Sequence, residues 1–215
     1  MKKGAIFDMD GLMFDTEQMY QDQWNRIAKE QGIELPADFV REICGTAGED
    51  LYAILRKYYH TEDPKSLFDQ VIGTVRDQLK TWVPVKAGCR EILEYFRNHQ
   101  VKLAVASSSP IEIVKSNLKV SGLEDCFDTV VSGAGLPHGK PWPDIFLLAA
   151  ERLSLKPEEC YVFEDAVNGV KAALSAGCTA VMIPDLVEPA EELRKAAVIC
   201  SSLSEAEEKI RAGKL

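Results

Sequence analysis

Five short apolar runs, each followed within two residues by Asp, Ser or Glu, recur along this chain and constrain its fold more than any other feature. Runs of this length predict buried strands of a parallel sheet, because both faces of such a sheet are covered. Segments with apolar residues at helical spacing separate the runs, so strands and helices alternate and the core is predicted to be α/β. The expected strands are Ala5–Phe7, Val101–Ala106, Thr129–Val131, Tyr161–Phe163 and Thr179–Ile183.

One long stretch, residues 16–83, interrupts this alternation. It has no convincing strand but several amphipathic helical patterns, the first with Tyr20, Trp24 and Ile27 on its apolar stripe. A chain of 215 residues can bury one good core and a smaller satellite, but not two large domains. The predicted fold is therefore a Rossmann-like, doubly wound parallel sheet with an inserted small α-helical domain. The core is expected to comprise residues 1–15 and 84–215, and the insertion residues 16–83.

Composition and charge exclude several classes of partner. The formal charge is −9, from 25 basic and 34 acidic residues, and no run of Lys or Arg could follow a phosphate backbone or an anionic membrane. No apolar run approaches the roughly 20 residues of a membrane span, and the first residues lead into a strand instead of a signal-peptide core. Six scattered cysteines without a C-x-x-C pair favour reduced packing residues. We therefore expect a cytoplasmic monomer that binds neither nucleic acid nor membranes.

Two carboxylates, Asp8 and Asp10, follow the first apolar run and precede Gly11. Taken alone, this composition fits an ordinary turn and a functional site equally well. The position favours a site, because the carboxyl ends of strands in an open parallel sheet meet at the ligand crevice. Two acids at that place repel each other unless a cation or a proton lies between them.

Ser107, Ser108 and Ser109 follow the second run and open a helix, where hydroxyl groups and free backbone amides favour an anion. The simpler interpretation is a serine N-cap, with Ser109 ahead of Pro110 at the first helical position. As an isolated signal, the N-cap is the more common explanation of such a pattern. The serines therefore indicate an anion site only in combination with the other motifs.

Two further segments would reach the same crevice. Lys140 precedes a proline that starts a helix, where its charge could neutralise a phosphoryl oxygen, although a lone lysine is usually solvated. Glu164 and Asp165 end the fourth run, where acids often serve only as partners of a helix dipole. Beside Asp8 and Asp10 they would also complete a set of hard oxygen ligands for Mg²⁺. Together these elements predict phosphoryl transfer by a carboxylate nucleophile, with an acid/base, a cation and phosphate-binding donors around it.

With these motifs in order, the sequence resembles the haloacid dehalogenase-like hydrolase superfamily, and within it the β-phosphoglucomutase-like branch with a helical cap. The resemblance spans nearly the whole chain. The core motifs are also similar to those of pseudouridine-5′-phosphatases and sugar-phosphate phosphatases of this branch. The segments that carry the resemblance are Asp8-Met9-Asp10-Gly11 with Asp15-Thr16-Glu17, Ala106-Ser107-Ser108-Ser109, Gly139-Lys140-Pro141 with Pro143-Asp144-Ile145-Phe146, and Phe163-Glu164-Asp165 with Asn168-Gly169-Val170.

The resemblance implies the activity of a Mg²⁺-dependent phosphatase that hydrolyses a small phosphorylated metabolite. Asp8 would attack phosphorus and become an aspartyl-phosphate, while Asp10 would protonate the leaving oxygen and then activate water. The family's cap closes over the crevice and contributes substrate contacts. The ligands implied for Mg²⁺ are Asp8, the Asp10 carbonyl and Asp165 with Glu164 nearby, and those implied for the phosphoryl oxygens are Ser107, the Ser108 amide and Lys140.

Substrate choice is expected to depend on the cap. Mutases of this branch carry a basic residue in the cap loop to hold a second phosphate, whereas the loop at residues 45–50 ends here in Glu49 and Asp50. This favours a phosphatase over a sugar-phosphate mutase, which stays as the alternative. For Trp24 the helical stripe favours core packing over a ligand contact. The candidates for substrate contacts in the cap are Tyr20, Thr46, Glu49 and Arg76.

Three other observations bear on the alternatives. A binding protein without catalysis would be marked by a lost acid or lysine, and none is lost. A haloacid dehalogenase uses one Asp nucleophile without metal and does not need Asp10 or the pair of Glu164 and Asp165. Trp142 departs from the family pattern, because relatives usually have a small or acidic residue between these two prolines. The substrate itself is not named by any of these motifs.

Overall fold

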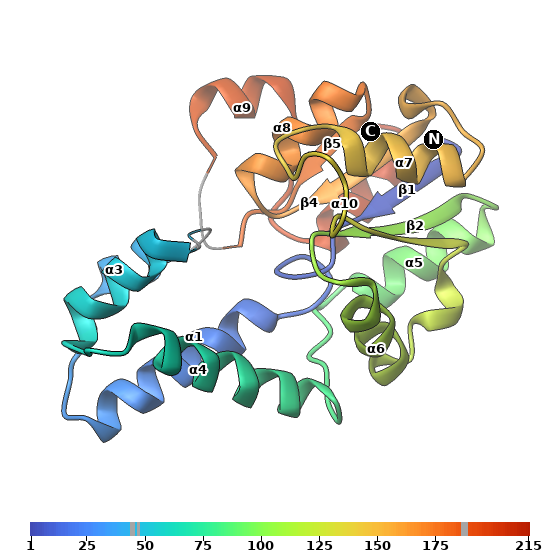
Figure 1. The fold of residues 1–215 in the computed structure, drawn as a ribbon. Helices are drawn as coiled ribbons and strands as arrows, with labels where there is room; N and C mark the ends of the chain where they lie inside the picture. The colour runs from blue at the N-terminus through green and yellow to red at the C-terminus, as the bar shows by residue number, and fades with distance from the viewer. Residues whose placement is uncertain (44–45, 47, 186–188) are drawn as a thin grey trace. The chain divides into compact units, whose positions relative to one another are not determined.

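The computed structural model describes residues 1–43, 46, 48–185 and 189–215 (Figure 1). The chain divides into two compact units, an α/β unit of Met1–Asp15 with Val83–Leu215 and a helical unit of Thr16–Trp82. Each unit has its own cluster of buried apolar side chains. No helix within the described ranges is long and apolar enough to cross a membrane.

A six-stranded parallel sheet forms the centre of the α/β unit and confirms the predicted fold class. The strand order is β3-β2-β1-β4-β5-β6, so the chain builds outward from β1 in one direction and then returns to build in the other. A crevice is expected at the carboxyl ends of β1 and β4, where the order reverses. The strands are β1 (Gly4–Phe7), β2 (Lys102–Ser107), β3 (Thr129–Ser132), β4 (Cys160–Glu164), β5 (Thr179–Met182) and β6 (Val198–Ile199).

Helices cover both faces of the sheet. They are α5 (Cys89–Asn98), α6 (Ile111–Ser121), α7 (Asp144–Arg152), α8 (Val167–Ala176), α9 (Glu191–Ala196) and α10 (Leu203–Arg211), with short 3₁₀ helices at Glu124–Cys126 and Pro157–Glu159. Helices α6 and α8 end at Gly122 and Gly177, as the sequence predicts. The strand β6 was not predicted, because two residues are too short to show a periodicity.

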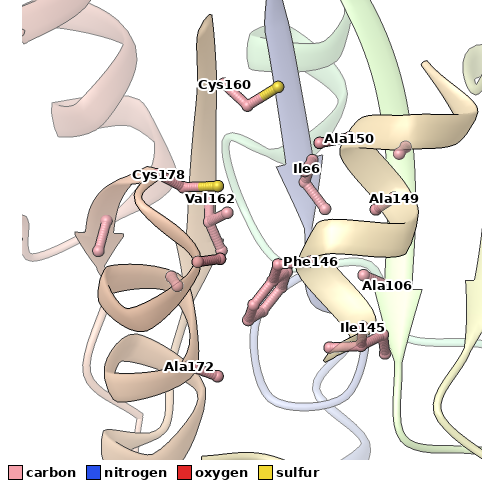
Figure 2. Close-up of a cluster of buried hydrophobic side chains, with 14 of the residues drawn as sticks. Ile6, Ala106, Ile145, Phe146, Ala149, Ala150, Cys160, Val162, Ala172 and Cys178 are labelled. Atoms are coloured by element: carbon pink, nitrogen blue, oxygen red, sulfur yellow. The ribbon is translucent and has the colours of Figure 1, made fainter. Parts of the chain in front are cut away.

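Successive residues of β1 point to opposite faces of the sheet and contribute to both layers of the core. Ile6 packs with Phe146 and Ala149 of α7 and with Val162 of β4 (Figure 2). Phe7 lies on the opposite face, where its ring stacks on Phe163 with the centroids 4.6 Å apart. Because the four residues of β1 are buried, the strand fixes the position of the residue that follows Phe7, which is Asp8.

The helical unit consists of α1 (Thr16–Glu30), α2 (Ala37–Ile43), α3 (Gly48–Tyr59) and α4 (Pro64–Leu79). Trp24 is 5% exposed and packs edge-on against Phe39, with the ring centroids 6.1 Å apart. Its backbone carbonyl also accepts a hydrogen bond from the Tyr59 hydroxyl. The prediction that Trp24 is a core residue is therefore confirmed.

Two linkers leave the α/β unit side by side. Phe14 and Val85 form an antiparallel bridge, and the Asp15 amide donates a hydrogen bond to the Pro84 carbonyl over 2.9 Å. The ammonium group of Lys86 lies 3.7 Å from Asp15 and also bonds to Asp185, which follows β5. Both connections between the units are therefore anchored to the α/β unit by backbone and ionic contacts.

The cysteines behave as expected in the part of the chain that the structure describes. Cys89, Cys126, Cys160, Cys178 and Cys200 are free thiols, and all but Cys126 are buried. Cys44 lies outside the described residues.

Candidate active site

Asp8 follows the central strand β1 and is 7% exposed. Its amide donates a hydrogen bond of 3.0 Å to the carbonyl of Phe163, so Asp8 continues the pairing between β1 and β4. Glu164 is the last residue of β4 and is 1% exposed. The sheet therefore places these two carboxylates at adjacent strand ends, where its order reverses.

Lys140 joins these two acids from the loop that precedes α7. Its Nζ atom lies 2.5 Å from Oδ1 of Asp8 and 2.6 Å from Oε1 of Glu164. The side chain is 11% exposed, so a lone lysine that would ordinarily be solvated is buried between two carboxylates. Ion pairs screened from water in this way are stronger than surface pairs, and each partner costs energy to leave unpaired.

The site holds more acidic groups than the positive charge of Lys140 can balance. Burial raises the pKa of Asp8 from 3.8 to about 7; the Lys140 ammonium opposes this shift, and the charges of Glu164 and Asp10 add to it. Burial lowers the pKa of Lys140, but the charges of Asp8 and Glu164 outweigh burial and leave that pKa above its usual value. The lysine is therefore a fixed cation, and one cation does not balance the acids around it.

Asp165 completes the acidic group. Burial, followed by the charges of Asp8 and Glu164, raises the pKa of Asp165 to about 9. The turn after Asp10 lies directly against this side chain, since a Cβ at Gly11 would be 2.4 Å from Oδ2 of Asp165. Gly11 also has φ of +83°, which L side chains rarely adopt. Glycine is thus required here both by the turn and by the approach of Asp165.

Asp10 is held by a serine whose role was wrongly predicted. The Ser109 hydroxyl donates a hydrogen bond of 3.0 Å to Oδ2 of Asp10. The residue that precedes α6 as its N-cap is Pro110, so the expected Ser109 cap does not form. The backbone of Ser109 is held as well, because the Ser132 hydroxyl at the end of β3 donates a hydrogen bond of 2.7 Å to the Ser109 carbonyl.

The other two serines differ in exposure. Ser107 ends β2 and is 1% exposed, and its Oγ accepts a hydrogen bond from the Ser109 amide over 3.1 Å. Ser108 is exposed. The Lys140 Nζ also lies 3.5 Å from the carbonyl of Ala106, which places the end of β2 beside the acidic group. The structure therefore brings the predicted phosphate-binding lysine and the serine strand end to one place.

The four cap candidates belong to different elements of the helical unit. Tyr20 lies on α1, is partly buried and packs against the apolar cluster of the helical unit. The Thr46 hydroxyl donates a hydrogen bond to the Ile43 carbonyl. Glu49, in the first turn of α3, pairs with Arg56 over 2.6 Å, and Arg76 is an exposed residue of α4. Residues 45 and 47 of the cap loop lie outside the described part of the chain.

The acidic side chains of the site are hard oxygen donors of the kind that bind Mg²⁺. The charges of Glu164 and Asp10 act on Asp8, those of Asp8 and Glu164 act on Asp165, and the Lys140 ammonium opposes both effects. Among the residues that the structure describes, no three acidic, His or Cys side chains converge closely enough to form a complete metal site. Mg²⁺ does not need such a cage, because it is usually bound by one or two carboxylates together with water and substrate phosphate. Hard oxygen donors with excess negative charge therefore fit this ion.

Sequence reasoning missed two contacts of the site and one contact of the linkers. Ser109 was assigned to a helix cap, and Ser132 and Asp185 were not considered. The only signal for them is position, since Ser132 ends β3 while Ser109 and Asp185 follow β2 and β5 at the same edge of the sheet. Trp142, the departure noted in the sequence, is 59% exposed, and its ring contacts that of His138 at a tilt, with the centroids 5.0 Å apart.

The fold and the site define an α/β protein with a buried, lysine-bridged group of carboxylates at the switch point of a parallel sheet. The chain belongs to the haloacid dehalogenase-like hydrolases, whose family model matches residues 5–183.

Three known proteins illustrate this membership. The phosphorylated carbohydrates phosphatase of Thermotoga maritima is 35% identical over 176 residues, which cover 81% of this chain and 82% of the relative. A crystal structure from the same organism, provisionally described as a β-phosphoglucomutase, has a TM-score of 0.81 and 30% identity and covers 98% of this chain and 99% of its own. A haloacid dehalogenase-family hydrolase of Deinococcus radiodurans, solved with phosphate and sodium, has a TM-score of 0.84 and 25% identity over 99% and 96% of the two chains.

Proposed function

We propose that this chain is a Mg²⁺-dependent phosphatase that hydrolyses small phosphorylated carbohydrates or similar metabolites through an aspartyl-phosphate. The observation that carries the proposal is the contact of the Lys140 ammonium with Asp8, at 2.5 Å, between largely buried side chains at the strand ends. A buried carboxylate beside a fixed cation is suited to attack a phosphoryl group, whose negative charge the cation offsets.

The first step transfers the phosphoryl group to the enzyme. A carboxylate oxygen of Asp8 attacks phosphorus, the bond from phosphorus to the substrate oxygen breaks, and protonated Asp10 gives its proton to that leaving oxygen. Lys140, Ser107 and the Ser108 amide bind the phosphoryl oxygens as charge moves onto them. The products of this step are the free alcohol and the phosphorylated Asp8.

The second step regenerates the carboxylate. Asp10, now ionised, takes a proton from a water molecule whose oxygen attacks phosphorus, and the bond between phosphorus and Asp8 breaks. Inorganic phosphate is released and Asp10 is again protonated. Ser109 orients Asp10 for both proton transfers through the bond of 3.0 Å to Oδ2.

Asp8, Asp165 and the Asp10 backbone carbonyl are the residues proposed to hold Mg²⁺, with Glu164 behind them. Bound there, the ion would supply positive charge that keeps Asp8 ionised at neutral pH and offsets the charge of the substrate phosphate. The raised pKa values of Asp8 and Asp165 support this assignment, because a cation relieves the repulsion that produces them.

The experiment measures phosphate released from p-nitrophenyl phosphate and from a panel of sugar phosphates, with Mg²⁺ and with EDTA. We expect Mg²⁺-dependent turnover that Asp8→Asn abolishes and that Asp125→Asn, at an exposed position, leaves unchanged. Substantial turnover by Asp8→Asn would refute the nucleophile assignment, and turnover insensitive to EDTA would refute the metal.

Substrate choice is proposed to depend on Tyr20, Thr46, Glu49 and Arg76. The name of the Thermotoga relative supports a phosphorylated carbohydrate as the class to test first. Replacing these four residues singly with Ala should change the ranking of substrates in the panel while activity on p-nitrophenyl phosphate is kept, because a small aryl ester makes few contacts. An unchanged ranking in all four variants would remove them as candidates.

A sugar-phosphate mutase is the second candidate, supported by the structural similarity to the provisional β-phosphoglucomutase. Against it, Glu49 carries negative charge in the segment where a second phosphate would need a cation, and its pairing with Arg56 neutralises that arginine. Product analysis separates the two activities, because a phosphatase yields free phosphate and a mutase yields an isomer. Isomer without phosphate would reverse the ranking.

A further inference from the structure

Gly169 lies in the first turn of α8, and its backbone faces the carboxylate of Glu164. A Cβ atom at Gly169 would lie 1.8 Å from Oε1 and 1.9 Å from Cδ of Glu164. Non-bonded heavy atoms make contact near 3.5–4.0 Å, so no side chain fits at this position while Glu164 stays in place.

The backbone conformation of Gly169 does not itself call for glycine. Residue 169 is helical and does not adopt a left-handed φ, and glycine is less favourable than alanine in a helix. The helix alone would therefore be more stable with alanine. The close approach of the Glu164 carboxylate is the feature that explains the glycine.

Glu164 has no freedom to turn away. Its Oε2 accepts a hydrogen bond of 2.9 Å from the Ala166 amide at the start of α8, and its Oε1 accepts the bond of 2.6 Å from Lys140. The side chain is 1% exposed. Any displacement of this carboxylate would break both bonds and leave the Lys140 ammonium with Asp8 as its remaining carboxylate partner among those described.

We propose that Gly169 is a positioning residue: by leaving room for the Glu164 carboxylate, it fixes the Lys140 ammonium against Asp8. The catalytic consequence rests on the function proposed above, whereas the contact between residues 169 and 164 does not. Gly169 touches neither substrate nor reacting atoms and acts only through Glu164.

The test is a double-mutant cycle of Gly169→Ala and Glu164→Ala, followed by thermal unfolding and by kcat/KM. In the native background, Gly169→Ala should lower Tm and lower kcat/KM by roughly 10- to 100-fold, the usual range for groups that orient a site. In the Glu164→Ala background the obstructing carboxylate is gone, so the same substitution should raise Tm and cost no further activity. The reversal of sign in Tm identifies the Glu164 carboxylate as the obstacle, and the absence of a further loss of kcat/KM in the Glu164→Ala background shows that Gly169 affects activity only through Glu164.

The control is Gly73→Ala in α4, another helical glycine, whose Cβ would meet no atom within 4 Å. It should raise Tm slightly and leave kcat/KM unchanged. If Gly169→Ala lowers Tm equally in both backgrounds, or if the two activity losses multiply, the proposal is overturned. Because the Tm cycle needs no turnover, it decides the contact even if no phosphatase activity is found. If Gly169→Ala fails to fold, the double variant Gly169→Ala with Glu164→Ala decides the question. Folding of the double variant supports the proposal, and its failure to fold when Glu164→Ala alone folds contradicts the proposal.

Discussion

The hydroxyl of Ser109 donates a hydrogen bond of 3.0 Å to Oδ2 of Asp10. It comes from the loop after β2, whereas Asp10 belongs to the turn after β1, so the contact joins two neighbouring strand ends. The Ser109 backbone is fixed in turn by Ser132 at the end of β3. Three adjacent strands thus determine the orientation of the carboxyl group proposed as acid and base.

Replacing Ser109 should impair proton transfer more than substrate binding. Ser109→Ala removes the donor and is expected to lower kcat by roughly tenfold, about 1.4 kcal/mol, which is typical of one hydrogen bond to a charged group. Ser109→Thr keeps the hydroxyl and should retain most activity. Ser116→Ala, on α6, serves as the control. A wild-type pH profile of kcat in Ser109→Ala would contradict the role.

Removing the Lys140 charge should destabilise the protein as well as inactivate it. Lys140→Met leaves Asp8 and Glu164 buried without their cation, and such uncompensated charge costs roughly 3–5 kcal/mol. We expect kcat to fall at least about 100-fold. Urea unfolding without Mg²⁺ measures the first effect, and Lys171→Met, exposed on α8, should differ from wild type by less than about 0.5 kcal/mol. Equal stability of Lys140→Met and wild type would show that the pair contributes nothing.

Stability should depend on pH and Mg²⁺ together. A carboxyl group whose folded pKa is raised keeps its proton in the folded chain after the unfolded chain has lost it. Without metal, stability should therefore be highest near pH 4 and fall as pH rises through about 7 for Asp8 and about 9 for Asp165, at up to about 1.4 kcal/mol per pH unit for each proton. Mg²⁺ competes with these protons, so the Tm increase on adding Mg²⁺ should grow with pH.

The variant Asp165→Asn provides the control for this linkage. It cannot ionise at residue 165, so its Tm in EDTA should fall less between pH 6 and pH 9 than that of the native chain, and Mg²⁺ should raise it less. Parallel pH curves for the two proteins would show that Asp165 does not titrate in this range. The measurement is a series of thermal melts in buffers of equal ionic strength.

Truncating the two tryptophans of the helical unit should lower the stability of the protein to very different extents. Trp24→Ala opens a cavity among Phe39 and Tyr59 and is expected to cost about 3–5 kcal/mol. Trp82 is 61% exposed, and Trp82→Ala should change stability by less than about 0.5 kcal/mol. Denaturant unfolding followed by circular dichroism compares them. Similar losses in both variants would contradict the core role of Trp24.

Much of this architecture could be predicted from local patterns. Most residues of β1 to β5 are apolar, as expected of parallel strands whose faces are both covered, and the acids at the ends of β1 and β4 mark the strand ends. Strand β6 escaped prediction because Val198 and Ile199 are only two residues and half buried.

The finer contacts of the site could not be predicted, because they depend on distances between segments far apart in sequence. Lys140 is separated from Asp8 by 132 residues, and its own segment marked it as a phosphate-binding candidate without indicating its ion pairs with Asp8 and Glu164. Ser109 carried a competing local explanation, since serine before proline is a common helix start, and its tertiary bond to Asp10 prevailed. Pattern reasoning likewise gave no reason to connect Gly169 with Glu164.

The antiparallel pairing of Phe14 with Val85 has a consequence for how such a chain can evolve. The Asp15 amide and the Pro84 carbonyl are 2.9 Å apart, so the α/β unit presents the two ends of the insertion at one point of its surface. Segments of very different length can be joined at closely spaced ends without altering strand order, since loop length itself costs little. We therefore expect that an insertion of another length or sequence could replace the helical unit without changing the strand order or the strand ends of the α/β unit.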